Sequence, residues 1–170
     1  MSKKTARIVQ EGDGLRFRAT TGSGHSLVID DAKGGEGPGP SELVPLAVAA
    51  CTGMDVISIL RKKRQEVTRY EVQATGWQRE EANPSIFTRI ELLHVVEGPQ
   101  VETEAVRRAI ELSATRYCSV GGTLSTGATV IQHDFLVRTD AGEEHGTVAV
   151  TGPNEDLAFP VPAAQARSTG

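Results

Sequence analysis

The chain has 170 residues and a formal net charge of −4, from 18 basic and 22 acidic side chains. This length suits a single compact domain with a sizeable core. The charge argues against a nucleic-acid-binding protein, because such a protein presents a basic face. The first residues include two lysines with no apolar stretch behind them, which is not the pattern of a signal peptide, and we expect a cytoplasmic protein.

Three short segments near the start of the chain alternate apolar and polar residues. They cover residues 6–11, 15–20 and 25–30, and glycine-containing turns separate them. This pattern predicts consecutive antiparallel strands joined by tight turns. A loop rich in glycine and proline follows at residues 34–40, and Ser41 stands where it could cap the next helix.

The next segment, residues 42–64, predicts a long helix. Its first half is apolar on every face, which is typical of a buried helix, and a basic run at residues 61–64 suits a helix C-terminus. The longest uninterrupted apolar run, residues 43–51, is shorter than the roughly 20 residues of a membrane span. We therefore expect a core helix and no association with a membrane.

The rest of the chain predicts strands on both sides of a second helix. We expect strands at residues 68–77 and 87–96, a helix at 101–117 and a last core strand at 128–138. Strands, helix, strands, helix and strand in this order indicate an α+β fold with antiparallel sheets. Residues 1–138 would form the domain, and residues 139–170 a partly flexible C-terminal extension with a short strand at 146–151.

Cys51 and Cys118 are the two cysteines of the chain. In the cytoplasm such cysteines are more often catalytic or redox-active than a structural disulfide, and without CxxC spacing they make a poor zinc site. Small neighbours leave room around Cys51 in the long helix, although a free cysteine is often a simple core residue. Cys118 ends the second helix beside a glycine-containing turn. Thiol chemistry on a peroxide needs a thiolate, and the sulfenic acid that results needs a second thiol.

Two segments around these cysteines resemble the OsmC/Ohr family, and most closely its YhfA-like subgroup. The first reads GPGPSELVPLAVAACTGMDVISIL (residues 37–60) and the second TRYCSVGGTL (residues 115–124). The family pairs a Pro-x-Glu-Leu helix start with Ala-Ala-Cys in the same helix, and it places a Tyr-Cys element at the end of the next long helix. The resemblance implies an OsmC-like fold, with antiparallel sheets wrapped around two long central helices in an intertwined homodimer.

The resemblance also implies an activity, that of a thiol-dependent hydroperoxide reductase acting on organic hydroperoxides. Cys51 would be the peroxidatic thiol and Cys118 the resolving thiol, in active sites at the subunit interface. No bound cofactor and no metal are implied. The disulfide would be reduced by an external dithiol, of the lipoyl type or another thiol.

The family's peroxidases add an arginine from an early strand and a glutamate. Arg16 and Arg18 are the candidates for the arginine; since they lie at i and i+2 on one strand, both could face the same way, and we prefer Arg18. The family's glutamate stands ten residues before the cysteine, where this chain has Ser41, whereas Glu42 stands nine before it. Because one residue turns a helix by about 100°, Glu42 either reaches the arginine despite this rotation or serves as a favourable charge at the helix N-terminus.

Two other functions stay open from the sequence. The chain could be a non-catalytic dimer that binds a small apolar ligand or senses redox state, which the displaced glutamate favours, or Cys51 could be an acyl nucleophile. Asp55 shares a helix face with Cys51, and we expect it to have a structural role. His25, His94 and His133 fall on predicted strands and are interpreted as ordinary strand residues.

Overall fold

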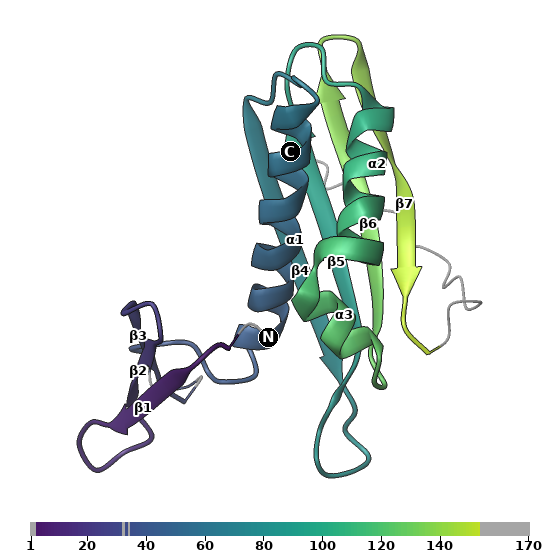
Figure 1. The fold of residues 1–170 in the computed structure, drawn as a ribbon. Helices are drawn as coiled ribbons and strands as arrows, with labels where there is room; N and C mark the ends of the chain where they lie inside the picture. Colours follow the sequence, from purple (N-terminus) through teal and green to yellow (C-terminus); the bar gives the residue numbers. More distant parts are fainter. Residues whose placement is uncertain (1–2, 32, 34, 154–170) are drawn as a thin grey trace, which may run out of the picture.

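The computed structural model of the protein describes residues 3–31, 33 and 35–153 and contains two β-sheets and a layer of helices. Figure 1 shows the helices together on one face of the larger sheet. The smaller sheet stands apart, near the N-terminal end of the long helix α1 (Leu43–Lys62). This mixed architecture confirms the predicted α+β class.

The smaller sheet contains the first three strands, β1 (Ala6–Gln10), β2 (Phe17–Thr21) and β3 (Ser26–Ile29). They pair in the order β1-β2-β3 and are all antiparallel, as their alternating sequences predict. Gly12 and Gly24 permit the turns because both adopt a positive φ, 75° and 88°. Three short strands bury little apolar surface by themselves, so this sheet needs a further surface to pack on.

Helix α1 ends close to its predicted limits. Every fourth residue from Val48 to Leu60 is fully buried, so one stripe of the helix lies against the core. The C-terminus closes in a Schellman-type arrangement, in which the N–H of Gln65 donates to the carbonyl of Leu60 at 3.0 Å. Arg64 takes the left-handed conformation that this ending requires, with φ 57°.

The larger sheet has four strands in the order β4 (Arg69–Gln78), β5 (Phe87–Glu97), β6 (Val130–Thr139) and β7 (Gly142–Thr151). β4 pairs with β5 and β6 with β7 in antiparallel fashion, whereas β5 and β6 run parallel. The prediction of antiparallel pairing is therefore incomplete. Parallel neighbours require a long crossover, and the chain between β5 and β6 supplies one that is mainly helical.

The crossover consists of α2 (Thr103–Leu112), a π-helical turn (Ser113–Tyr117, labelled η1 in the element order) and the short helix α3 (Ser119–Ser125). The predicted helix at residues 101–117 is present but changes its winding after Leu112. Helix α3 differs from the sequence-based expectation, which takes Gly121 and Gly122 as a turn. π-helical turns are rare and occur frequently at functional sites, so this change of winding marks the region before Cys118.

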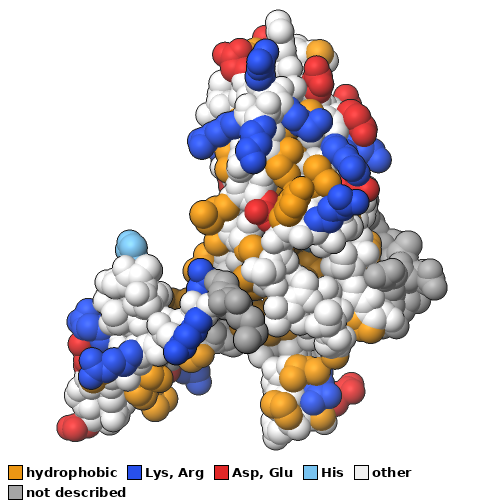
Figure 2. All heavy atoms as spheres, in the orientation of Figure 1, with side chains coloured by type: hydrophobic (Ala, Val, Ile, Leu, Met, Phe, Trp, Pro, Cys, Tyr) orange, Lys and Arg blue, Asp and Glu red, His pale blue; other side chains and the backbone are white. Residues whose placement is uncertain are grey.

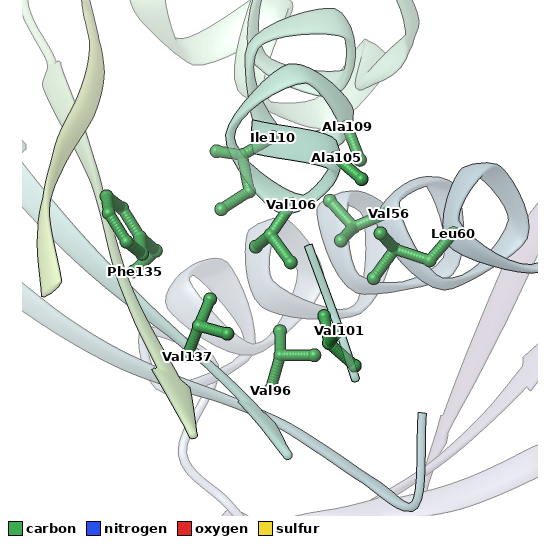
Figure 3. Close-up of a cluster of buried hydrophobic side chains, with 10 residues drawn as sticks. All are labelled: Val56, Leu60, Val96, Val101, Ala105, Val106, Ala109, Ile110, Phe135 and Val137. Carbon is green, nitrogen blue, oxygen red and sulfur yellow. The ribbon is translucent and has the colours of Figure 1, made fainter. Parts of the chain in front are cut away.

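Two clusters of apolar side chains hold the helices on the larger sheet. The first, drawn in Figure 3, contains Val56, Leu60, Val96, Val101, Ala105, Val106, Ala109, Ile110, Phe135 and Val137. The second contains Val48, Ala49, Ile90, Leu92 and Ile131, and side chains of α3 pack against it. Full burial of one such valine, leucine or isoleucine side chain contributes about 1.5–3 kcal/mol. The second cluster supports the part of α1 that carries Cys51.

Strand β7 changes the predicted end of the domain. The sequence predicts a partly flexible extension after Arg138 with a strand only at residues 146–151, but residues 142–151 form a full strand paired with β6. Val148 of this strand packs against the first apolar cluster. The folded domain therefore continues to Thr151, and residues 154–170 of the predicted extension lie outside the described residues.

Part of the apolar surface is uncovered in a single chain. Met54 and Leu46 of α1 are 74% and 59% exposed, so this helix is not buried on every side as predicted. Ile8 and Leu15, on or beside the smaller sheet, are 60% and 66% exposed. Within the described residues, no strand of that sheet packs closely against the helices or the larger sheet. Figure 2 shows hydrophobic side chains at the surface both of the part that contains the smaller sheet and of the part that contains the larger sheet and the helices.

By length and composition alone, α1 is apolar enough to cross a membrane, with 20 residues and a mean hydropathy of 2.0 over its 18-residue window. The uninterrupted run at residues 43–51 therefore understates the apolar length of this helix. A core helix of a soluble protein meets the same criterion. Here one side of α1 packs against β4 and α2, as a core helix does.

Candidate functional site

Cys51 lies in the third turn of α1 and is half-buried. It sits between the exposed Ala50 and the fully buried Thr52, at the border between the covered and uncovered sides of the helix. The core therefore fixes the backbone at Cys51 while its sulfur stays partly accessible. This combination suits a thiol that must be reached by another molecule.

Cys118 joins the π-helical turn to α3 and is buried, with 5% of the residue exposed. Its N–H donates to the carbonyl of Ser113 at 2.9 Å. Its Sγ accepts a hydrogen bond from the N–H of Gly121 at 3.3 Å and so caps the first turn of α3. Cys118 is thus held between two helical segments and does not lie on a loose turn.

The two thiols meet between the helices. Both cysteines are free, and the Cys51 side chain lies beside that of Cys118. Burial, together with the neighbouring Cys51 side chain, raises the pKa of the Cys118 thiol to about 12. At neutral pH Cys118 is therefore a protonated thiol beside a more accessible one, so the two cysteines have different environments.

Of the two predicted arginine candidates, Arg18 lies on strand β2 of the smaller sheet and Arg16 immediately precedes that strand; both pair with Glu11. Arg18 Nε lies 2.6 Å from Glu11 Oε1, and Arg16 forms ion pairs with Glu11 and Glu36. The Arg18 guanidinium holds the pKa of the Glu11 carboxyl below its usual value. Because the small sheet does not pack closely on α1, one chain alone does not bring either arginine to Cys51.

Glu42 immediately precedes the first turn of α1. Its Oε2 accepts a hydrogen bond from the N–H of Gly39 at 2.7 Å, which closes the loop before the helix. Among the described residues, no arginine or lysine forms an ion pair with Glu42. The predicted cap by Ser41 is wrong, since the start of α1 has no side-chain cap.

Three polar side chains that the sequence did not connect to one another lie beside the thiol pair. Ser113 Oγ is 3.0 Å from both Thr52 Oγ1 and Asp55 Oδ2. Thr52 and Ser113 are buried, and Asp55 is half-buried. Ser113 lies on the apolar stripe of the second predicted helix, and a buried hydroxyl on such a stripe needs a partner. The position of Ser113 on this stripe is the feature of the sequence that could have indicated the three-residue group.

A row of aromatic polar side chains crosses the inner face of the larger sheet. Tyr70 Oη and His94 Nδ1 share a hydrogen bond of 2.7 Å, and His94 Nε2 lies 3.5 Å from His133 Nδ1. Neighbouring rings are stacked. Burial lowers the pKa of His94 to about 3 and that of His133 to about 4, so both are neutral at physiological pH. His94 and His133 lie on strands β5 and β6, as predicted, and are buried, whereas His25 is exposed.

A surface hollow of about 740 Å³ lies where α2 begins, against the turn between β6 and β7. Its lining includes Glu102, Glu104, Arg107 and Glu144 but neither cysteine. In the part of the chain that the structure describes, no three histidine, cysteine or carboxylate side chains converge as they would around a metal ion.

Gly121→Ala should disturb Cys118, because a Cβ at this position would lie 3.2 Å from Cys118 Sγ. We expect the free energy of unfolding to fall by about 1–3 kcal/mol from overpacking, and alkylation of Cys118 to become faster as the sulfur is displaced. Chemical denaturation and timed alkylation with mass spectrometry measure the two effects. Gly122→Ala is the matched control: nothing lies within 4 Å of its Cβ, so both quantities should stay level or stability should rise. Equal behaviour of the two variants would refute the steric argument.

The chain is thus an α+β protein in which two thiols of unequal exposure lie side by side at the helical crossover. Its family follows from comparison with known proteins: residues 33–134 match the OsmC-like protein family, and the chain belongs to it. The predicted resemblance to this family is thereby confirmed.

Individual relatives agree with this assignment. Protein YhfA of Escherichia coli K12 is 42% identical over 125 residues, which cover 74% of this chain and 92% of that protein. A hypothetical protein from Aquifex aeolicus VF5 superposes with a TM-score of 0.72 at 28% identity, covering 82% of this chain and 99% of the other. An organic hydroperoxide resistance protein from Elizabethkingia anophelis shares the fold, with a TM-score of 0.58 at 16% identity over 82% and 98% of the two chains.

Proposed function

We propose that the protein is a thiol-dependent reductase of organic hydroperoxides, with Cys51 as the peroxidatic thiol and Cys118 as the resolving thiol. The observation that carries the proposal is the placement of a half-buried Cys51 directly beside a buried, protonated Cys118. Membership in the OsmC-like family supports it, as does the fold shared with a protein named for organic hydroperoxide resistance.

The reaction has three steps. The Cys51 thiolate attacks the terminal peroxide oxygen, the O–O bond breaks, and the alkoxide leaves as an alcohol after taking a proton. The Cys118 sulfur then attacks the Cys51 sulfenic acid, a disulfide forms, and hydroxide leaves with the Cys118 proton as water. An external dithiol, of the lipoyl type or similar, restores both thiols and becomes a disulfide itself.

Turnover with defined reagents tests this proposal directly. Purified protein supplied with cumene or tert-butyl hydroperoxide and dihydrolipoamide should consume the peroxide catalytically, whereas monothiols should support the reaction poorly because two electrons must be delivered to one disulfide. We place the reaction in the cytoplasm, where thiols stay reduced between turnovers. No consumption above the uncatalysed rate with any thiol reductant would overturn the proposal.

The same proposal includes a homodimer, with a second copy covering the apolar surfaces left open in one chain. The smaller sheet presents Ile8 and Leu15 and, within the described part of the chain, packs closely on neither the helices nor the larger sheet. Helix α1 presents Leu46 and Met54. Docking of the small sheet on the helices of a partner would cover both surfaces. It would also carry the arginines of that sheet toward Cys51, where a cation favours the thiolate.

Met54→Asp should dissociate this dimer. A charge at a side chain that is 74% exposed in one chain costs little in the monomer but is expensive in a dry interface. We expect a shift from dimer to monomer in size-exclusion chromatography with light scattering, and an apparent affinity between subunits at least about 100-fold weaker.

The control for this variant is Gln100→Asp, which adds the same charge at an exposed position before α2. It should leave the mass in solution unchanged. A Met54→Asp protein with the same mass in solution as the natural chain would contradict an interface on this side of α1.

One observation favours a non-catalytic alternative, a dimer that binds a small apolar ligand or senses redox state. Glu42 is hydrogen-bonded to Gly39, and no described residue connects it to an arginine. Under this alternative Cys51 reacts once with peroxide, or not at all, and no dithiol supports turnover. The turnover assay with dihydrolipoamide separates the two functions.

A further inference from the structure

The hydroxyl group of Ser113 connects the π-helical turn before Cys118 to α1 by hydrogen bonds. Ser113, the first residue of this turn, is 1% exposed, and its Oγ lies 3.0 Å from Asp55 Oδ2 and 3.0 Å from Thr52 Oγ1. Its carbonyl accepts the N–H of Cys118 at 2.9 Å. Asp55 is therefore linked to the backbone of the buried cysteine through one residue.

The single hydrogen of the Ser113 hydroxyl has two acceptors within reach, and these differ in strength. A hydroxyl has one hydrogen, so Ser113, which is the donor toward both Asp55 Oδ2 and Thr52 Oγ1, can donate fully to only one of them at a time. The bond to the Asp55 carboxylate is charge-assisted, the stronger kind, and is therefore favoured. Without that carboxylate Ser113 keeps only Thr52 Oγ1 as an acceptor, and the stronger hydrogen bond between the turn and α1 is lost.

The charge on Asp55 faces the site from close by. Tyr70 of β4 faces this charge, and burial together with the Asp55 charge raises the pKa of Tyr70. Ser113 and Cys118 of the crossover also face it. Cys51 precedes Asp55 by one turn of α1. No described lysine or arginine forms an ion pair with Asp55. Its negative charge therefore helps to raise the pKa of Cys118, and no ion pair among the described residues neutralises it.

We propose that Asp55 is the positioning residue of the thiol pair: through Ser113 it fixes the turn that holds Cys118 against Cys51, and its charge adds to the burial that disfavours an anion on the Cys118 sulfur. This inference rests on the proposed function and deepens it. It explains why two adjacent thiols would not exchange roles, since the carboxylate disfavours an anion on the buried sulfur that it also positions.

A protonated Cys118 beside Cys51 is consistent with a resolving step that needs no added reagent. Oxidation converts Cys51 to a sulfenic acid, and the Cys118 sulfur then attacks the Cys51 sulfur as its S–O bond breaks. The departing hydroxide takes the Cys118 proton and leaves as water. A proton that is still on Cys118 when the sulfenic acid forms is therefore consumed in the step itself.

The first test uses no peroxide. In a Cys51→Ser background, the thiolate absorbance of Cys118 at 240 nm is titrated with and without Asp55→Asn. Asparagine keeps an acceptor for Ser113 but removes the charge, so the pKa of Cys118 should fall by about one. Glu66→Gln, which removes a charge at an exposed position between α1 and β4, is the control and should change nothing. An unchanged titration in Asp55→Asn would overturn the electrostatic part.

The second test follows disulfide closure by quenched mass spectrometry after one equivalent of peroxide, in proteins whose folding is checked by thermal unfolding. Ser113→Ala and Asp55→Ala should slow closure about tenfold and raise the sulfinic fraction of Cys51, whereas Asp55→Asn should close at least as fast as the natural chain. Unaltered closure in Ser113→Ala would overturn the positioning part. If the natural chain forms no sulfenic acid, the proposed function fails while the titration still decides the role of Asp55.

Discussion

Cys51→Ser should lower the consumption of organic hydroperoxide by about three orders of magnitude or more, to the uncatalysed rate. A serine hydroxyl has the same shape but does not ionise near neutral pH, and in this proposal no other group attacks the peroxide. Cys51 is also the accessible member of the pair, since Cys118 is buried and its raised pKa of about 12 keeps it protonated. Initial rates with dihydrolipoamide as reductant measure the effect.

Cys118→Ser provides the informative counterpart. This variant should still lose one equivalent of peroxide and form a sulfenic acid at Cys51, but it should not turn over with a dithiol and should accumulate sulfinic acid. Reversed phenotypes, with Cys118 essential for the first oxidation and Cys51 dispensable, would contradict the assignment of roles. Activity retained in both variants would remove the thiol mechanism altogether.

Acid should destabilise the protein well above the range in which carboxylates titrate, because of His94 and His133. Both are buried and neutral, with pKa values of about 3 and about 4, whereas a histidine in the unfolded chain titrates near 6.5. Their contribution to stability is therefore complete above pH 6.5. As the pH falls below 6.5, the two histidines bind protons in the unfolded chain but stay neutral in the folded chain, so the free energy of unfolding drops.

The expected size is about 1.4 kcal/mol per pH unit for each histidine, or roughly 4 kcal/mol for the pair between pH 6.5 and pH 5. Urea unfolding at fixed protein concentration from pH 7 to pH 5 measures it. Tyr70→Phe together with His94→Leu should about halve the slope without leaving a buried hydroxyl unpaired, and Tyr70→Phe alone should keep it. A slope that stays the same when His94 is removed would contradict buried neutral histidines.

The sequence predicts the elements of the fold better than their packing. Alternation and helical periodicity indicate each strand and both long helices, because the burial of one face leaves a local pattern. The parallel pairing of β5 and β6 leaves no such pattern, since both strands are apolar on their inner face whichever way they run. The sequence predicts only residues 146–151 of strand β7, because Glu143, Glu144 and His145 are polar; on this edge strand they are exposed.

The residues of the candidate site also differ in how far the sequence predicts them. Cys51 and Cys118 stand out from the sequence because their chemistry is specific, and the structure brings their side chains together. Asp55 and Ser113 contact each other only because α2 crosses α1, and no spacing in the sequence encodes that distance. The place of Arg18 relative to Cys51 could not be predicted, because within the described residues the smaller sheet packs closely on neither α1 nor the larger sheet.

The most direct test of the central claim, that Cys51 and Cys118 form a working redox pair, is the intact mass of the protein after one equivalent of tert-butyl hydroperoxide. We predict the loss of two hydrogen atoms per chain, reversed by dihydrolipoamide, with peptide mapping that joins Cys51 to Cys118. An unchanged mass, a gain of oxygen that a dithiol does not reverse, or a disulfide between two copies of one cysteine would contradict the account.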